Sequence, residues 1–286
     1  MRRLGGDWGF LVTDVGEGEA ANDERLAYVF DRRAVRLAGL AGELVIAEED
    51  FGSATTPLRK QFARSPYMVS FEAGPPAKPV GFTLISLHVV FGNKPADRTP
   101  EIQTFANRLK RRAQDPDEFG RNMLALGDFN IDRWLDDPNA DAFRSEGLTP
   151  PFELLGLPRT IFDDPAKPHF YDQISWFTTG NRAGLTLTYQ QQAGLIDWEP
   201  HLHNDLTKVA KSWRISDHYP LWPASSSPRH AGPEEVWSHG AAAPAACRRP
   251  APHSAGRRSR VRRCACPSIS RRRRWQSFQH PRTGSS

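Results

Sequence analysis

Short apolar segments of strand length recur along residues 1–222, and their spacing limits the possible fold more than any other feature of the sequence. Arg25–Asp31 and Pro66–Gly74 alternate apolar and polar residues, as half-buried strands do. Gly81–Gly92 is more continuously apolar, which is typical of a central strand, and MLALGDFNI, YDQISWF and LTLTYQQ are further strand-like segments. Thr99–Gln114 is instead predicted to be a helix, because one helical face collects its apolar residues Ile102, Phe105, Leu109 and Ala113. The sequence therefore predicts an α/β domain.

The composition limits the classes of protein to which the chain can belong. A length of 286 residues allows one large domain or two small ones. No window approaches the roughly 18 consecutive apolar residues of a membrane span, and the start MRRLGGDWGF lacks the apolar stretch of a signal peptide. The three cysteines, Cys247, Cys264 and Cys266, all lie near the end of the chain, which fits a reducing compartment. We therefore expect a cytoplasmic monomer without a membrane partner.

The last part of the chain, residues 223–286, differs in composition from residues 1–222. It holds 13 Arg, 2 Glu and no Lys, a charge of +11, whereas the whole chain carries +5, so that residues 1–222 carry −6. This Ala/Pro/Ser/Arg-rich segment has almost no apolar periodicity and is predicted to be a disordered tail. It is either a basic arm that binds polyanions or a sequence never selected for function, such as a shifted reading frame. The basic pI does not indicate that residues 1–222 bind nucleic acid.

Polar residues fall at the ends of the apolar segments: His88 in LISLHVVFG, Asp128 and Asn130 in LGDFN, Asp172 in FYDQISW, and Asp217 with His218 in ISDHYP. Each has an ordinary structural interpretation, since G-D-x-N is usually a turn, a strand histidine is usually a core residue and S-D-H can be a loop. In this order, however, they indicate a phosphate or metal site. Carboxylate and amide oxygens suit a hard ion such as Mg²⁺, Mn²⁺ or Ca²⁺. Residues 1–222 contain no zinc-ligand spacing, and His201 and His203 are expected in a surface loop.

With these motifs the chain resembles the endonuclease/exonuclease/phosphatase superfamily, and in particular its deoxyribonuclease-I-like bacterial members. NDERLAYVFD resembles the family's E-R-Y strand, KQFARSPYMVSF its F-x-R-x-P strand, and SDHYPLW the end of its domain. The resemblance implies a four-layer α/β sandwich over residues 1–222, with two mostly antiparallel sheets flanked by helices. It also implies metal-dependent hydrolysis of phosphodiesters in DNA or RNA.

The resemblance further implies two imidazoles, each oriented by a carboxylate. His218 is expected to act as a base or proton relay, held and made more basic by Asp172. His88 is expected to be the second imidazole at the phosphate, oriented by Glu24. A carboxylate bonded to one ring nitrogen determines which nitrogen faces the reaction.

Four more residues receive roles from the resemblance. Asp217 is expected to be a metal ligand, and Asp128 to contribute to the same ion, Mg²⁺ or alternatively Mn²⁺ or Ca²⁺. Asp128 and Asn130 would position the nucleophile, the phosphate or a second ion, three alternatives that stay open. Arg64 is expected to contact a substrate phosphate as a forked donor.

The resemblance does not extend to the first strands of the family. Members begin with a strand that carries an Asn and a second strand that ends in a Q-E pair, whose Glu is the principal metal ligand. Those strands would precede GGDWGFLVTDVGEGE, so we expect them and their ligand to be missing from this chain. Four other glutamates lie in a different context and are not candidates to replace it: Glu17, Glu19, Glu48 and Glu49.

Two further interpretations of the function stay open. One is a phosphomonoesterase or phospholipid-type hydrolase of the same superfamily, although inositol-phosphatase members carry W-C-D-R where this chain has Tyr171–Ile174. The other is a non-catalytic remnant that at most binds polyanions through its tail. The partner is thus expected to be nucleic acid or another phosphoester.

Overall fold

The computed structural model describes residues 4–15, 23–114, 122–164, 166–177 and 186–226. The chain divides into two units, residues 1–235 and 236–286, and everything below concerns the first. The predicted tail beyond residue 226, with all three cysteines, lies outside the described residues, so its disorder stays a prediction. No helix within the described ranges is long and apolar enough to cross a membrane.

A six-stranded sheet is the largest element of the described chain. Its order is β3–β4–β5–β6–β8–β7, and the strands are β3 (Val35–Glu43), β4 (Tyr67–Ala73), β5 (Val80–His88), β6 (Met123–Asp128), β7 (Leu148–Thr149) and β8 (Asp172–Phe177). Neighbouring strands are antiparallel except β5 and β6, which are parallel. The α/β class and a mostly antiparallel sheet, both predicted from the sequence, are therefore confirmed.

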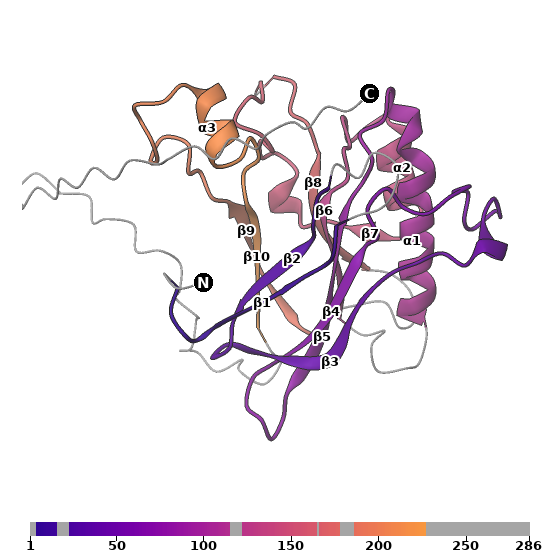
Figure 1. Cartoon of the computed structure of the whole chain (residues 1–286), viewed down its shortest axis with the longest axis horizontal. Coiled ribbons are helices and arrows are strands. Elements are labelled where there is room, and N and C mark those ends of the chain that lie inside the picture. Colours follow the sequence, from indigo (N-terminus) through magenta and orange to yellow (C-terminus); the bar gives the residue numbers. More distant parts are fainter. Residues whose placement is uncertain (1–3, 16–22, 115–121, 165, 178–185, 227–286) are drawn as a thin grey trace, which may run out of the picture. The chain divides into compact units, whose positions relative to one another are not determined.

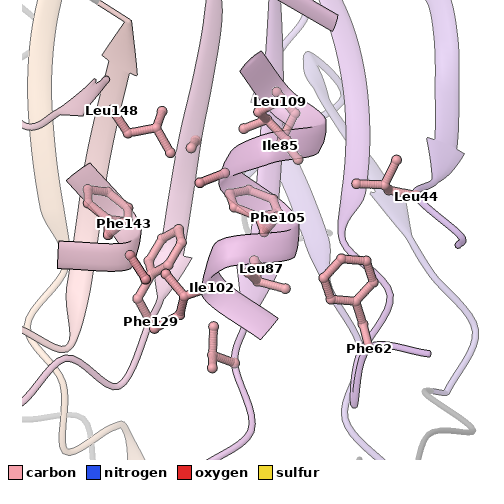
Figure 2. Packing of buried hydrophobic residues seen from close by; sticks show 14 of the residues in the cluster. Leu44, Phe62, Ile85, Leu87, Ile102, Phe105, Leu109, Phe129, Phe143 and Leu148 are labelled. Carbon is pink, nitrogen blue, oxygen red and sulfur yellow. The ribbon is translucent and has the colours of Figure 1, made fainter. Parts of the chain in front are cut away.

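Helices cover one face of this sheet (Figure 1). Helix α1 (Thr99–Gln114) makes the crossover between the parallel strands β5 and β6, the kind of connection that parallel neighbours require. As predicted, α1 buries its apolar stripe, and Figure 2 shows the contacts with the sheet and with α2 (Pro138–Arg144), formed among others by Ile85, Leu87, Ile102, Phe105, Leu109, Phe129 and Phe143. Phe129 lies between Phe105 and Phe143, with ring centroids 5.6 and 4.8 Å away.

The opposite face of the large sheet is covered by two separate antiparallel ladders instead of one second sheet (Figure 1). They are β1 (Trp8–Val12) with β2 (Ala27–Asp31), and β9 (Thr188–Leu195) with β10 (Leu221–Ser226). Tyr28 of β2 packs on Tyr67 and Phe71 of β4, and its hydroxyl donates to the Tyr67 carbonyl at 2.9 Å. The expected sandwich is therefore present, but in the described residues its second sheet is divided.

Several elements lie outside the sequence prediction. The structure adds strands β1, β3 and β7, helix α2, helix α3 (Lys208–Arg214) and short 3-10 turns at Glu48–Asp50, Pro95–Asp97 and Phe152–Leu154. Strand β10 continues to Ser226, past the domain end expected at Trp222. Apart from β3, these elements are short, so their residues carry little periodic signal. The nine-residue β3 contains two glycines, Gly39 and Gly42, which are uncommon in strands.

Candidate active site

Three predicted site residues lie side by side across the centre of the large sheet. His88 ends β5 and is the register partner of Asp128, which ends β6; Asp128 is in turn the register partner of Asp172, which begins β8. Neighbouring strands lie about 5 Å apart. The pairing therefore brings an imidazole and two carboxylates together at one end of the three central strands. The structure thus brings together three of the residues that the motifs singled out.

The GDFN segment is both a turn and part of this site. Gly127 has φ +132°, and a Cβ at this position would lie 2.0 Å from the Leu87 carbonyl oxygen, so only glycine fits beside β5. After it, the Asn130 backbone N–H donates to Asp128 Oδ1 at 2.8 Å, and Asn130 itself has φ +51°. The Asn130 amide donates to the Val89 carbonyl at 2.8 Å. The turn thereby fixes the Asp128 carboxylate against the end of β5.

His218 forms the first carboxylate–imidazole pair. Its Nδ1 lies 2.5 Å from Asp172 Oδ2, as the sequence predicted. Burial disfavours the charged ring, but the hydrogen bond and charge of Asp172, with the charges of Asp128 and Asp217, outweigh it and raise the pKa of His218 to about 9. At neutral pH the ring is therefore mainly protonated.

Hydrogen bonds fix the segment that carries His218. The Tyr219 N–H donates to the Arg159 carbonyl and the Ile161 N–H to the Asp217 carbonyl, both at 2.8 Å. Arg159 is fully buried, and its Nε donates to the Asp172 carbonyl at 2.8 Å. Burial lowers the pKa of Arg159 to about 10, which still leaves it charged at neutral pH. Arg159 therefore links the strand of Asp172 to the segment of His218.

His88 forms the second pair, and a third group shares its carboxylate. Glu24 Oε2 lies 2.6 Å from His88 Nδ1, as predicted, and 2.7 Å from Arg64 Nε. The Arg64 Nε–H lacks the alignment of a hydrogen bond, so the contact with Glu24 is an ion pair. The Arg64 side chain is only 5% exposed, and its Nη1 donates to the His88 carbonyl at 3.4 Å. In this structure Arg64 contacts both Glu24 and the His88 backbone and so helps to hold the pair in place. Its contact with a substrate phosphate stays a prediction.

Asp128 lies between the two pairs. Its Oδ2 is 3.5 Å from His88 Nε2. Burial and the nearby charge of Asp172 raise the pKa of Asp128, although His88, His218 and the Asn130 N–H act in the opposite direction. Asp128 is therefore coupled electrostatically to both imidazoles.

The metal ligands expected at this site were Asp128 and Asp217. The Asp217 residue is exposed, and its charge reaches His218. Within the described ranges, however, no group of three His, Cys, Asp or Glu residues is arranged to hold a metal ion. Glu24 and Asp172 are each already bonded to an imidazole. The described donors thus do not form a complete divalent-ion site, and the metal role of Asp128 and Asp217 stays a prediction.

Sequence reasoning did not find Glu101, which supports the His88 pair. This carboxylate, at the start of α1, is 2% exposed and accepts 2.8 Å hydrogen bonds from the Ala63 and Val90 N–H groups. It thereby connects the segment before Arg64 with the segment after His88. An acidic residue in a first helical turn is common, so the sequence offered no separate signal for this role.

The comparisons with known proteins agree with the motifs. A curated deoxyribonuclease from Thioalkalivibrio sp. (strain K90mix) is 24% identical over 226 residues, which are 76% of this chain and 55% of that protein. This chain thus spans about half the length of that relative. The predicted resemblance is therefore confirmed along most of the chain. No family model matches.

Two solved structures match most of this chain at low sequence identity. An endonuclease/exonuclease/phosphatase family protein from Leptotrichia buccalis C-1013-b is 15% identical, with a TM-score of 0.46 over 79% of this chain and 74% of that one. The mannosyl-6-phosphatase Bt3783 of Bacteroides thetaiotaomicron VPI-5482 is also 15% identical, with a TM-score of 0.46 over 78% and 79% of the two chains.

Proposed function

We propose that this protein hydrolyses phosphodiester bonds in a nucleic acid. The observation that carries the proposal is the row His88–Asp128–Asp172 at the ends of three neighbouring strands, with His218 bonded to Asp172. Two imidazoles, each oriented by a carboxylate, can hold a phosphate and move protons to or from its oxygens. The name of the curated relative, deoxyribonuclease, favours DNA as the substrate.

The proposed roles follow from the contacts of each ring. His218 bonds Asp172 through Nδ1, which leaves Nε2 for the reaction, and its raised pKa provides a proton at neutral pH. It is thus suited to donate that proton to the leaving oxygen, and it can act as a base only as the pH approaches 9. His88 also bonds its carboxylate through Nδ1, and its Nε2 faces Asp128. We assign His88 to holding the phosphate.

A nicking assay on the full chain tests this proposal. Supercoiled plasmid and a labelled single-stranded RNA are incubated with Mg²⁺ or Mn²⁺, with and without chelator, and product is followed over time. We expect cleavage that His218→Ala reduces by roughly 10²–10⁴-fold, the usual contribution of a positioned acid or base. His201→Ala, which removes an exposed histidine from another loop, is the matched control and should leave the rate unchanged. Cleavage that survives His218→Ala would refute the assignment.

A second candidate function is hydrolysis of a small phosphoester with an apolar group. A cavity of about 590 Å³ adjoins Asp172 and His218, and its lining includes Ile174, Ile196 and Trp198. Apolar walls with a few polar groups at one side are typical of small-molecule sites. Hydrolysis of p-nitrophenyl phosphate without any cleavage of nucleic acid, abolished by His218→Ala and slowed by Ile174→Trp, would favour this candidate.

A further inference from the structure

A third carboxylate–imidazole pair lies next to the candidate active site. His169 Nδ1 is 2.7 Å from Asp163 Oδ1. The Asp163 side chain is 1% exposed, whereas the His169 side chain is 40% exposed. The carboxylate is therefore part of the interior, and the imidazole reaches from it towards solvent.

The surroundings of Asp163 determine which nitrogen of His169 is free. The backbone N–H groups of Arg159 and Thr160 donate to Asp163 Oδ2 at 2.6 and 3.1 Å. Burial works against the charged carboxylate, but these bonds and the bond from His169 outweigh it and hold the pKa of Asp163 below its usual value. An ionised carboxylate accepts only, so His169 Nδ1 carries a proton. Nε2 is then the remaining ring nitrogen, on a side chain that is 40% exposed, and no hydrogen bond to it is formed within the described part of the chain.

Tyr171 connects this pair to His218. The rings of His169 and Tyr171 are stacked, with centroids 4.6 Å apart and planes 14° apart. The Tyr171 ring lies 6.0 Å from that of His218, at 30°. The two imidazoles thus contact the same aromatic ring, and His169 lies beside the reacting position rather than in it.

The turn that holds Asp163 is also bonded to the segment of His218. Thr160 and His218 form an isolated antiparallel bridge, which is made by the Ile161 and Tyr219 hydrogen bonds described above. Backbone bonds therefore fix the turn that holds Asp163 relative to His218, and the side-chain bond to Asp163 joins His169 to that turn. A ligand group bound at His169 would have a defined distance from the group bound at His218.

We propose that His169 binds a second phosphate group of the substrate, next to the phosphate that lies at His218. This inference rests on the proposed function, because a polynucleotide offers a neighbouring phosphate and a phosphomonoester does not. Because Nδ1 remains bonded to Asp163, a phosphate oxygen would be bound by Nε2, which donates when the bound anion brings a second proton onto the ring. His169 thereby favours polynucleotides over small phosphoesters.

Two substitutions separate this binding role from a structural role. His169→Asn keeps an N–H near the position of Nδ1 for Asp163 but removes the outward nitrogen, whereas His169→Ala removes both. We expect each variant to lower kcat/KM for an oligonucleotide by about 10- to 100-fold, the effect of one charged hydrogen bond, mainly through KM. Hydrolysis of bis(p-nitrophenyl) phosphate, which has one phosphate, should not change. If His169→Asn cleaved the oligonucleotide as fast as the unaltered chain, the role would be structural and the proposal wrong.

A spectroscopic measurement tests the same proposal without activity. Imidazole ¹H–¹⁵N spectra of the full chain are recorded during titration with the dinucleotide pTpT and, separately, with inorganic phosphate, and His169→Asn and His218→Ala assign the two signals. We expect pTpT to shift both signals and inorganic phosphate to shift that of His218 alone. A His169 signal that stays fixed while His218 shifts would overturn the inference but leave the proposed function standing. If neither signal moved, both proposals would fail.

Discussion

The two carboxylate–imidazole pairs of the candidate active site have the same chemistry but different surroundings. Asp172 gives its Oδ2 to His218 alone, whereas Glu24 gives one oxygen to both His88 and the buried guanidinium of Arg64. Around His218 the further charges are carboxylates, and the pKa of the ring rises to about 9. Around His88 a permanent cation already balances the carboxylate.

This difference in surroundings indicates that the two carboxylate–imidazole pairs have different roles. An imidazole among uncompensated carboxylates keeps a proton at neutral pH and can transfer it. An imidazole whose carboxylate is already paired with arginine is held mainly in place. We therefore propose proton transfer for the Asp172–His218 pair and phosphate positioning for the Glu24–His88 pair.

The largest expected effect is on the rate of phosphodiester cleavage. We expect His218→Ala to lower kcat by roughly 10²–10⁴-fold. We expect His88→Ala to act more on KM than on kcat, because it removes a contact to the bound phosphate. Steady-state kinetics on one oligonucleotide would measure both. Equal losses in kcat for the two variants would remove the distinction between the pairs.

Removal of the Glu101 carboxylate, which connects the segments around the His88 pair, is expected to have a second, smaller effect, on the stability of the fold. Glu101→Ala leaves the N–H groups of Ala63 and Val90 without their acceptor, at a cost of about 1–3 kcal/mol for each buried group. Urea unfolding of the full chain measures the change in the free energy of unfolding, and exposed Glu49→Ala is the matched control. The nuclear magnetic resonance signal of His88 should also move while that of His218 stays. A shift of both signals would show that the His88–Glu24 pair and the His218–Asp172 pair are not structurally independent.

The pH dependence of stability sharpens the contrast further. The pKa of His218 in the folded chain, about 9, is above its ordinary value of 6.5, so its proton stabilises the fold. This contribution is fully present below about pH 6.5 and is lost as the pH rises through about 9. Asp172→Asn should flatten the decline in the free energy of unfolding over this range, because it removes the carboxylate that holds the proton on His218. An undiminished decline in Asp172→Asn would contradict the role of this carboxylate in holding the proton of His218.

The smallest expected effect is the binding of a divalent ion. Asp128 and Asp217 supply two carboxylates, fewer than a complete site for a hard cation requires, so we expect a Kd of about 10⁻³ M or weaker for Mg²⁺. Isothermal titration calorimetry would measure it, and Asp217→Asn should weaken it again. A micromolar Kd would mean that a further ligand completes the site beside Asp128.

The sequence alone determined the features that depend on local patterns. The apolar stripe of α1, the strands β4, β5, β6 and β8, and the polar residues at their ends follow from periodicity and from short motifs. Gly127 and Asn130 sit where the chain must turn, so their residue types are set locally. The pairing of His218 with Asp172 and of His88 with Glu24 came from the resemblance and is present in the structure.

The tertiary structure decided the contacts that no local pattern encodes. Glu101 joins two segments through backbone N–H groups, which every sequence offers, so its residue type gave no hint of its partners. The burial of Arg64 behind Glu24, the bond from Asp163 to His169 and the stacking of His169 on Tyr171 likewise depend on how distant turns pack. The charge states at the site belong to this group, since a pKa depends on burial and on neighbouring charges brought together only by the fold.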